Sequence, residues 1–230
     1  MFKLQDVTVI YPDKTKAVDN VSFSLGGGES IALIGENGAG KTSLLLAIVG
    51  ILETAGGAVE INGIQLAKKT VNEIRRQIGL VFQNPDDQLF MPLIYDDIAF
   101  GCRNFGLPED EVQKRVDETI DKLNIGRLRG RSSLKLSAGE KRMAAIAAVL
   151  AMNPALLILD EPTAFLDPKA KRALAETLNT LPQAKIVATH DMEFAVKVCN
   201  RVIVLKNGRI MADGALSILK NKEFMQNCGL

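Results

Sequence analysis

Short runs of β-branched and other apolar residues recur along the chain, and each run predicts a strand. Three runs are apolar at almost every position, at 31–34, 156–159 and 186–188. Continuous apolar runs are typical of parallel strands that are covered on both faces. Further runs predict strands at 7–10, 21–23, 78–82 and 202–205. The pattern therefore indicates a sheet whose central strands are parallel.

Helical patterns lie between these runs. Residues 108–123 begin with Pro108 and three acidic residues, which favour a helix N-terminus, and then repeat apolar residues at helical spacing. Asp167 followed by Pro168 predicts the N-cap and first residue of another helix. The remaining helices are predicted at 41–52 and 139–152. Since 92–152 carries only helical pattern, we expect an α/β core that is interrupted by a helical segment.

Composition narrows the possible partners. The chain has 230 residues, 47% of them hydrophobic, and a formal net charge of +1. This length can bury a sizeable core within one domain. The charge is too balanced for a polybasic surface, and the 5% of aromatic residues, with no Trp, are too few for a base-stacking platform. We therefore expect no nucleic-acid partner.

The three cysteines are far apart in the sequence, and His190 is the only histidine. Because zinc sites need clustered Cys and His ligands, we expect reduced thiols and no zinc site built by the protein. The N-terminus lacks the apolar run of a signal peptide, and no run of about 18 apolar residues is present. We therefore expect neither a secretory signal nor a membrane-spanning segment.

Residues 35–42 carry the clearest chemical signal, because they match the pattern GxxxxGK[ST] between a predicted strand and a predicted helix. Glycines let successive backbone N–H groups curl around phosphate oxygens, and the helix N-terminus adds its positive dipole end. Lys41 is expected to reach the β- and γ-phosphates, and the Thr42 hydroxyl to ligate Mg²⁺. By contrast, the glycines at 26–28 fit no phosphate motif and predict a turn.

Polar residues follow three of the predicted strands, where an open α/β sheet gathers its ligands. Asp160 is expected to hold Mg²⁺, and Glu161 to polarise the attacking water. His190 suits a contact with the γ-phosphate, and Gln83 a Mg²⁺ ligand or a water-binding group. Each of these residues is unremarkable alone: a strand end is often simply solvated, and a lone histidine is more often structural. Asp191 is expected to cap the helix that follows it.

Residues 136–140 precede a predicted helix and form a second anion-binding feature through Ser137, Gly139 and the helix start. Since 35–42 already supplies a phosphate cradle, a second one suggests a nucleotide held between two chains. The alternative is an ordinary Ser N-cap with Glu140 in the first turn.

Together these motifs resemble those of an ATP-binding-cassette (ABC) ATPase, in the right order and over essentially the whole chain. Residues 35–42 match the Walker A motif, Gln83 the Q-loop, 136–140 the signature motif, 156–160 the Walker B motif with catalytic Glu161 after it, 164–167 the D-loop and His190 the switch histidine. Tyr11 lies where the family has its adenine-stacking aromatic residue. The resemblance implies catalytic roles for Glu161, His190 and Gln83, and metal ligation by Thr42, Gln83 and Asp160. It implies nucleotide binding by Tyr11, Asn37, Gly38, Ala39, Gly40, Lys41, Thr42, Ser43, Ser137 and Gly139.

The resemblance also implies the architecture: an α/β fold with a P-loop NTPase (RecA-like) core and mixed sheet, an inserted α-helical subdomain and an N-terminal antiparallel β subdomain. We expect one ABC ATPase domain over 1–230, whose nucleotide-binding core takes 1–91 and 153–214. The helical subdomain is expected at 92–152 and a short C-terminal tail at 215–230. Two such chains are expected to form a head-to-tail dimer, identical or not, with two ATP sites in its interface.

The chain departs from the family pattern at three positions. Ala138 replaces a glycine of the signature LSGGQ, and Glu140 replaces its glutamine. Glu140 would put a carboxylate near a nucleotide, so we expect it to point away from the phosphates. Ala164 replaces the usual first serine of the D-loop, which removes a hydroxyl from the dimer interface. None of these changes removes a group that hydrolysis needs.

Two segments resemble a particular branch of the family. Residues 81–90 are similar to the Q-loop segment of energy-coupling-factor (ECF) importer ATPases, and 137–142 with 147–152 resemble their cobalt and nickel group. This implies an ATPase that energises metal-ion uptake from the cytoplasmic face of the membrane, with transmembrane subunits docked near 84–100. A vitamin importer of the ECF type remains the nearest alternative.

Three other classes fit less well. A soluble ABC ATPase of DNA repair or ribosomes usually has a coiled-coil insertion or two fused cassettes, and the chain shows neither pattern. A nucleotide-binding regulatory subunit that does not hydrolyse ATP would lack the acid at position 161, which is present here as Glu161. A P-loop kinase would not need the signature motif at 136–140.

Overall fold

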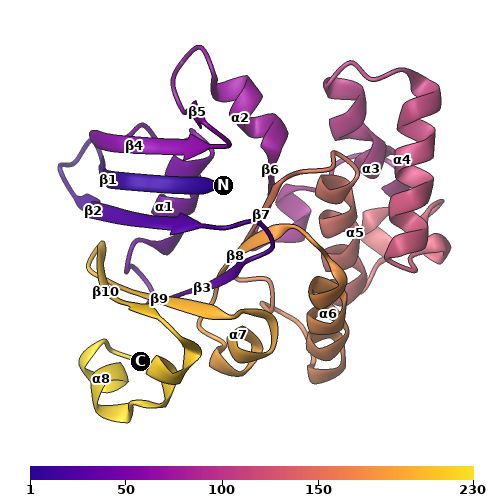
Figure 1. The fold of residues 1–230 in the computed structure, drawn as a ribbon. Helices are drawn as coiled ribbons and strands as arrows, with labels where there is room; N and C mark the ends of the chain where they lie inside the picture. Colours follow the sequence, from indigo (N-terminus) through magenta and orange to yellow (C-terminus); the bar gives the residue numbers. More distant parts are fainter.

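The structure is a computed structural model that describes residues 1–230. Its strands are β1 (Phe2–Ile10), β2 (Lys16–Leu25), β3 (Ser30–Ile34), β4 (Gly56–Ile61), β5 (Ile64–Gln65), β6 (Ile78–Val81), β7 (Leu156–Asp160), β8 (Ala184–Ala188), β9 (Arg201–Lys206) and β10 (Arg209–Gly214). Its α-helices are α1 (Lys41–Ile48), α2 (Val71–Gln77), α3 (Ile94–Asn104), α4 (Glu109–Lys122), α5 (Ala138–Leu150), α6 (Pro168–Thr180), α7 (Met192–Val198) and α8 (Lys222–Asn227). Figure 1 shows their arrangement.

A six-stranded mixed sheet of order β10-β9-β3-β8-β7-β6 forms the centre of the molecule. Strands β9, β3, β8, β7 and β6 run parallel, and only β10 is antiparallel to its neighbour. Every residue of β3, β7 and β8 is buried, as their continuous apolar runs predicted. In this register Asp160 of β7 lies beside Ala188 of β8, so the carboxyl ends of the central strands share one edge.

The N-terminal strands form a separate antiparallel sheet of order β2-β1-β4-β5. Helix α1 lies between the two sheets, since it contacts β1 and β2 of one and β7 of the other. One continuous cluster of 26 buried hydrophobic residues fills this space. The helix that follows the glycine-rich loop is therefore held on both sides by packed apolar side chains, which fixes its N-terminus.

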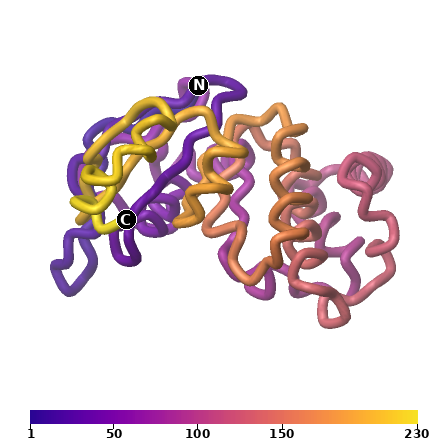
Figure 2. Tube along the Cα trace, turned by 90° about the horizontal axis from the view of Figure 1, so that it is seen from below, coloured from indigo at the N-terminus to yellow at the C-terminus, as the bar shows by residue number.

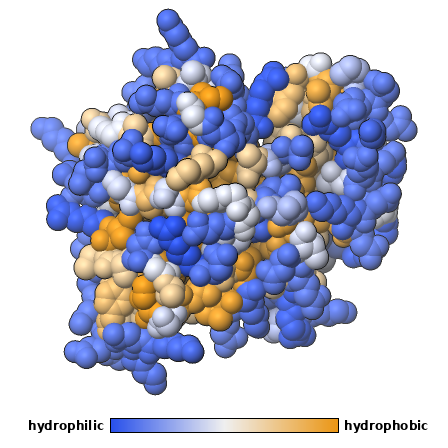
Figure 3. Space-filling view, in the orientation of Figure 1, coloured by the Kyte–Doolittle hydropathy of each residue, from blue (hydrophilic) through white to orange (hydrophobic).

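The other face of the central sheet is covered by helices, and a second cluster of 37 buried hydrophobic residues lies there. Figures 1 and 2 place α3 and α4 at the opposite end of the molecule from the antiparallel sheet and the C-terminus. Figure 3 shows hydrophilic residues along the outer side of this end. Residues 94–150 contain only α-helices and short 3₁₀ turns. The division of the chain into core, helical subdomain and tail stays a prediction.

Every strand and helix predicted from the sequence is present, although β1 and β2 each begin five residues earlier than predicted. The first helix ends at Ile48 instead of residue 52, because Gly50 has a φ of 68° and so leaves the helical conformation. The cap of α6 by Asp167 and that of α7 by Asp191 are confirmed, since each side chain accepts a hydrogen bond from the backbone N–H three residues later. The glycines at 26–28 form the expected turn.

Several elements were not predicted, namely β4, β5, β10, α2 and α8, and α3 was expected only as part of the helical segment 92–152. The strands among them are partly exposed and contain glycines or polar residues, so their pattern is weak. Helix α8 packs Met225 and Cys228 into the second cluster. It also brings the chain end to the glycine-rich loop: Lys206 donates a hydrogen bond to the carbonyl of Asn227, and the side chain of Glu36 contacts Gly229.

None of the helices combines the length and the hydrophobicity that a membrane-spanning segment needs.

Candidate nucleotide-binding site

A cavity of about 590 Å³ opens at the carboxyl edge of the central sheet, beneath the glycine-rich loop. It brings together most residues that the sequence nominated, although they come from five separate segments. The nominated residues that line it are Tyr11, Asn37, Gly38, Gly40, Lys41, Thr42, Ser43, Gln83, Asp160, Glu161 and His190. Their functional roles stay predictions, but their convergence in one cavity is a property of the fold.

The glycine-rich loop runs from β3 into α1, and two of its glycines are required by close backbone approaches. A Cβ on Gly35 would lie 2.5 Å from the carbonyl oxygen of Leu205. Gly40 has a φ of 100°, and a Cβ there would collide with the carbonyl oxygen of Ala17. The loop is therefore held tightly against β9 and the start of β2. Gly38 and Gly40 of the loop and the first residues of α1 line the cavity, and a glycine-rich loop that leads into a helix N-terminus is a feature that can bind an anion.

Lys41 is the first residue of α1 and is buried, with 7% of its surface exposed. Its ammonium group donates hydrogen bonds to the carbonyl oxygens of Gly35, at 2.7 Å, and Glu36, at 3.0 Å. It also lies 4.0 Å from a carboxylate oxygen of Glu161. A buried ammonium needs such partners. A phosphate entering the loop would offer oxygens to the same group.

Asp160 ends β7 and faces Thr42, whose hydroxyl donates a 2.8 Å hydrogen bond to Oδ2 of Asp160. The other carboxylate oxygen, Oδ1, is buried and has no partner. Burial raises the pKa of Asp160, although the bond from Thr42 opposes this. A hydroxyl beside a carboxylate with one free oxygen fits Mg²⁺, which binds oxygen ligands and uses only one or two carboxylates when a nucleotide supplies the rest.

Glu161 follows Asp160 and is equally buried, with 7% exposed. Its Oε2 lies 2.8 Å from Nδ1 of His190, whose side chain is largely exposed. The backbone of Glu161 has a φ of 43°, in the left-handed region that residues with a Cβ seldom adopt. This backbone turn directs a carboxylate into the cavity directly after a buried strand. Strain of this kind is common at active sites.

Gln83 and Tyr11 lie at the rim of the cavity. Gln83 follows β6, and its side chain is exposed. The phenolic oxygen of Tyr11 lies 2.9 Å from the hydroxyl of Ser43, so this pair links the antiparallel sheet to α1. This contact places Tyr11 beside the phosphate loop, and its adenine-stacking role stays a prediction.

Three nominated residues do not line this cavity. Ala39 is buried within the loop and accepts a backbone hydrogen bond from Gly208. Ser137 and Gly139 line a different cavity, of about 270 Å³, beside α6. Ser137 caps α5 in a capping box with Glu140, which is the structural alternative that its sequence allowed. Within one chain, the signature motif is thus separate from the phosphate loop.

The departure at Glu140 has a local explanation. Its Oε2 accepts hydrogen bonds of 3.0 Å from both the backbone N–H and the hydroxyl of Ser137. Its other oxygen lies 3.4 Å from Arg127 and 3.6 Å from Arg131. The backbone N–H of Ser137 is the largest influence that lowers the pKa of Glu140. The extra negative charge at the start of α5 is therefore balanced by two arginines.

Sequence reasoning missed five residues that line the cavity: Thr15, Lys16, Ala17, Asn207 and Gly208. Asn207 and Gly208 form the turn between β9 and β10, with φ values of 49° and 75°. An Asn-Gly pair between two strands predicts such a turn, so this signal was available. Its proximity to the phosphate loop was not, because the bond from Gly208 to Ala39 joins segments that are far apart in sequence.

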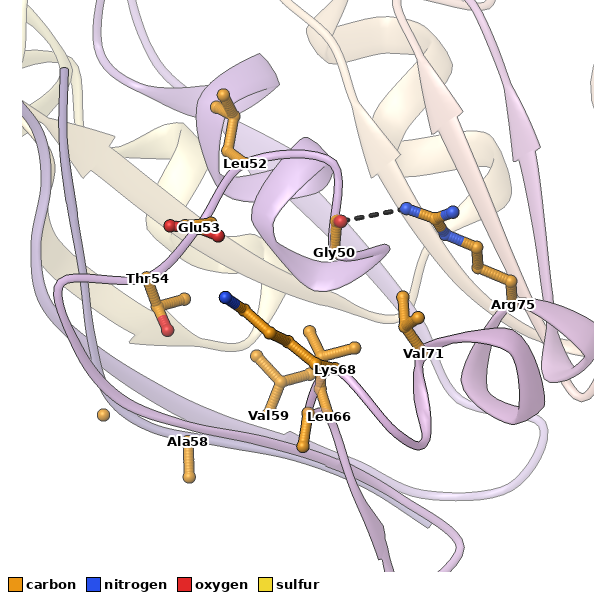
Figure 4. A pocket seen from close by; sticks show the side chains of 12 residues that line it. Gly50, Leu52, Glu53, Thr54, Ala58, Val59, Leu66, Lys68, Val71 and Arg75 are labelled. Carbon is orange, nitrogen blue, oxygen red and sulfur yellow. Dashed lines mark hydrogen bonds between the residues drawn. The ribbon is translucent and has the colours of Figure 1, made fainter. Parts of the chain in front are cut away.

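A further cavity, of about 390 Å³, lies between the end of α1, β4 and the start of α2. Figure 4 shows its lining, in which Arg75 donates a hydrogen bond to the carbonyl of Gly50. Apolar side chains such as Val59 and Leu66 form much of its wall. It contains none of the nominated residues, so it does not compete with the site described above.

Known proteins resemble this chain in sequence and in fold. The family model described as ABC transporter matches residues 18–164. An energy-coupling factor transporter ATP-binding protein from Carboxydothermus hydrogenoformans is 42% identical, over 99% of this chain and 86% of that protein. The structure of cbiO1 from Clostridium perfringens, part of the ABC transporter complex cbiONQ, aligns with a TM-score of 0.86 and 36% identity, over 98% of this chain and 93% of that one. A dimeric structure of the ATP-binding cassette MJ0796, bound to ADP and Pi, aligns with a TM-score of 0.82 and 28% identity, over 94% and 99% of the two chains.

Proposed function

The chain belongs to the ABC transporter family as an ATP-binding subunit of the energy-coupling-factor type, and we propose that it powers the uptake of cobalt or nickel ions. ATP hydrolysis is the activity of such a subunit. The single observation that carries the proposal is the meeting of Lys41, Thr42, Asp160 and Glu161 in one cavity of a chain with full-length relatives of this type. The likeness to cbiO1 supports the choice of metal ion over vitamin as cargo.

In the proposed site, the loop at 35–42 holds the phosphates of ATP and Lys41 moves from its carbonyl partners to the β- and γ-phosphates. Tyr11 stacks on the adenine. Thr42, Asp160 and Gln83 would hold Mg²⁺, which supplies charge neutralisation for the phosphates when it is bound. The free Oδ1 of Asp160 supports this assignment, because a buried carboxylate oxygen without a partner is costly.

Glu161 is the proposed general base. It would accept a proton from the water that attacks the γ-phosphate, while His190 contacts that phosphate and, through its 2.8 Å contact, orients the carboxylate. Burial of Glu161 favours this role, since a carboxylate in a dry site interacts strongly with charge that develops nearby.

The second half of the site is proposed to come from another ABC ATPase chain. Ser137, Gly139 and the N-terminus of α5 would contact the γ-phosphate of an ATP that is bound to the partner's loop. A two-fold interface between identical chains would create this arrangement twice. Loss of the γ-phosphate on hydrolysis then removes the bridge between the chains, which gives a conformational signal for transport.

The transmembrane subunits are proposed to dock near 84–100, which would place the chain on the cytoplasmic face of the membrane. In this segment Phe90 and Phe100 are 62% and 40% exposed, and their rings meet edge to face. Leu93 is 40% exposed, whereas Leu89 belongs to the core. Exposed aromatic and aliphatic residues in one patch are typical of a protein interaction surface.

The catalytic assignment is tested by Glu161→Gln, with Glu118→Gln on the exposed face of α4 as a matched control. The first variant should lose turnover by about 10²–10⁴-fold, the usual contribution of a general base, while it still binds ATP and accumulates as a dimer. Steady-state phosphate release and light scattering with ATP measure both effects. Unchanged hydrolysis in Glu161→Gln would refute the assignment, and the control should match wild type.

The cargo is tested by purifying the chain together with its membrane subunits and measuring metals in the complex by mass spectrometry. We expect cobalt or nickel at a stoichiometric level in the purified complex. In transport assays with vesicles, uptake of this metal should be lost when the complex carries Glu161→Gln. A vitamin bound in place of the metal would overturn the metal assignment and leave the ATPase assignment intact.

A further inference from the structure

Arg142 is the most deeply buried charged residue of the chain, with 1% of its surface exposed. It lies on α5, five residues after the signature serine, and its guanidinium group reaches the segment that follows β6. Nη1 donates a 2.6 Å hydrogen bond to the carbonyl oxygen of Phe82, and Nη2 one of the same length to the carbonyl oxygen of Gln83. Its Nε atom is buried without a partner.

Burial of this charge costs free energy unless hydrogen bonds and opposite charges compensate it. Burial of a guanidinium group disfavours its charged form, and here it lowers the pKa of Arg142 to about 10. The nearby carboxylate of Asp160 opposes this effect by favouring the cation. Two carbonyls and one carboxylate thus compensate a charge that an apolar side chain would avoid. One carbonyl belongs to Gln83 itself, the proposed Mg²⁺ ligand, and the other to the residue before it, Phe82.

Other contacts join the same two segments. Gln88 donates a 2.8 Å hydrogen bond to the carbonyl of Ala145 on α5, and its side-chain oxygen accepts one from the N–H of Phe82. Lys141 forms a 2.6 Å ion pair with Asp86. Residues 82–88 are therefore attached to α5 at several points, and the bonds from Arg142 hold the end of this segment that includes Gln83, which lines the nucleotide cavity.

We infer that Arg142 is a positioning residue, which fixes the backbone at Gln83 to the signature helix so that the two move as one unit. The inference rests on the proposed function, because it assigns a consequence to the role of Gln83 at the Mg²⁺ site. The same helix carries Ser137 at its N-terminus. A movement of α5 that offers Ser137 to a partner chain would then also carry Gln83 to or from the nucleotide of its own chain.

The first experiment compares Arg142→Gln with Arg142→Lys in the purified ATPase, alone and assembled with its membrane subunits. The Gln variant removes the charge and should raise the Mg²⁺ concentration for half-maximal ATPase activity by about tenfold, because small misplacements of a reacting group cost rate steeply. Its affinity for ATP in the absence of Mg²⁺ should stay within about twofold, since no contact to the phosphate loop is lost. The Lys variant keeps the charge and should restore part of the Mg²⁺ response.

Arg75→Gln is the matched control. Arg75 also donates two guanidinium hydrogen bonds to consecutive carbonyls, those of Val49 and Gly50, but it does so at the cavity of Figure 4, away from the Q-loop. It should leave the Mg²⁺ response unchanged. A response in the control equal to that of Arg142→Gln would show that loss of any such clamp has this effect, and would overturn the inference. If Arg142→Gln does not fold, Arg142→Lys is compared with wild type instead. The Mg²⁺ concentration for half-maximal ATPase activity then decides whether the inference holds.

A double-mutant cycle with Gln83→Ala separates the inference from the proposed function. If Gln83→Ala alone leaves the Mg²⁺ response unchanged, the proposed role of Gln83 is wrong and Arg142 has nothing to position. If Gln83→Ala alters the response and Arg142→Gln has little further effect in that background, the two residues act through one another and the inference is supported. Full additivity of the two effects would refute it while the role of Gln83 stands.

Discussion

The nucleotide cavity and the N-terminus of α5 differ in how far one chain completes them. In the cavity the charged groups are buried and paired: Lys41 and Glu161 are each 7% exposed, and Thr42 is bonded to Asp160. At the start of α5 the surface is open. Ser137 is exposed. Two large hydrophobic residues near it are also mostly exposed to solvent, Leu134 by 86% and Phe165 by 78%.

This contrast indicates which half of the site can bind a nucleotide without a partner chain. For binding, the cavity needs only the nucleotide and an ion, since its polar groups are already fixed by the fold. The start of α5 has satisfied its own cap through Ser137 and Glu140, so its remaining N–H groups and exposed apolar neighbours are available to another molecule. The first two predictions below test this difference and the third concerns the proposed docking surface; they run from the largest expected effect to the smallest.

The largest effect is expected for Lys41→Ala, which removes the buried ammonium from the phosphate loop. Loss of one charge-assisted phosphate contact should weaken ATP binding by about 10–100-fold and abolish measurable turnover. Isothermal titration with a non-hydrolysable ATP analogue measures the affinity. Lys114→Ala on the exposed side of α4 is the control and should bind like wild type. If Lys41→Ala binds ATP as tightly as wild type, the buried ammonium group does not hold the phosphates in this cavity.

The next prediction concerns the open half and uses mixtures of two inactive variants. Ser137→Asp keeps an N-cap side chain but adds a negative charge toward the phosphate of the partner's site. Alone it should be inactive, as should Lys41→Ala. Mixed in equal amounts they should regain about a quarter of wild-type turnover, because about half of the dimers are mixed and each of these has one intact site.

Two controls accompany the mixture. Ser137→Asn retains a neutral cap and should lose less activity than Ser137→Asp. Melting temperatures should show that both variants fold. No recovery of activity on mixing, with dimers present by light scattering, would mean that the start of α5 does not complete a partner's site.

The smallest effect concerns Asp97 of α3, which holds part of the proposed docking surface at 84–100. Its Oδ1 accepts hydrogen bonds from the N–H groups of Phe90 and Met91, and its Oδ2 is buried without a partner. Burial raises the pKa of Asp97. A raised pKa in the folded state means that the protonated side chain stabilises the fold below the ordinary pKa, and that this stabilisation is lost as the pH rises through the folded-state value.

Asp97→Asn should therefore raise the melting temperature by about 1–2 °C at pH 7, with a gain that shrinks toward pH 4. Calorimetry across this range measures the trend, and Asp110→Asn on the exposed face of α4 should show none of it. A loss of stability that is equal at every pH would mean that the carboxylate charge of Asp97 helps to hold this segment.

The sequence predicted those elements whose residue pattern identifies them without knowledge of the surrounding packing. Strands β3, β7 and β8 were found because strands buried on both faces are continuously apolar. Helix α3 was predicted only within the helical segment 92–152, and its own bounds were missed for a physical reason. It has no side-chain N-cap bond, and it contains Gly101, which reads as a helix breaker until the packing is known. In the fold, the side chain of Met152 occupies the space where a Cβ of residue 101 would stand.

The candidate site likewise contains residues that the sequence indicated and a residue that it did not. Lys41, Asp160 and Glu161 were nominated because their motifs combine residue type with place in the sequence. The role inferred for Arg142 has no such signal, since an arginine on a polar stretch of helix usually faces water. Its burial depends on the carbonyls of Phe82 and Gln83, which lie 60 and 59 residues away in the sequence.

The left-handed backbone of Glu161 has a consequence for laboratory evolution. A residue with a Cβ loses roughly 1–2 kcal/mol in this conformation, whereas glycine does not. Glu161→Gly is one base change away from either glutamate codon, and it would relieve this strain while it deletes the proposed base. A selection that scores thermal stability alone should therefore enrich this substitution and yield sturdier proteins that no longer turn over ATP.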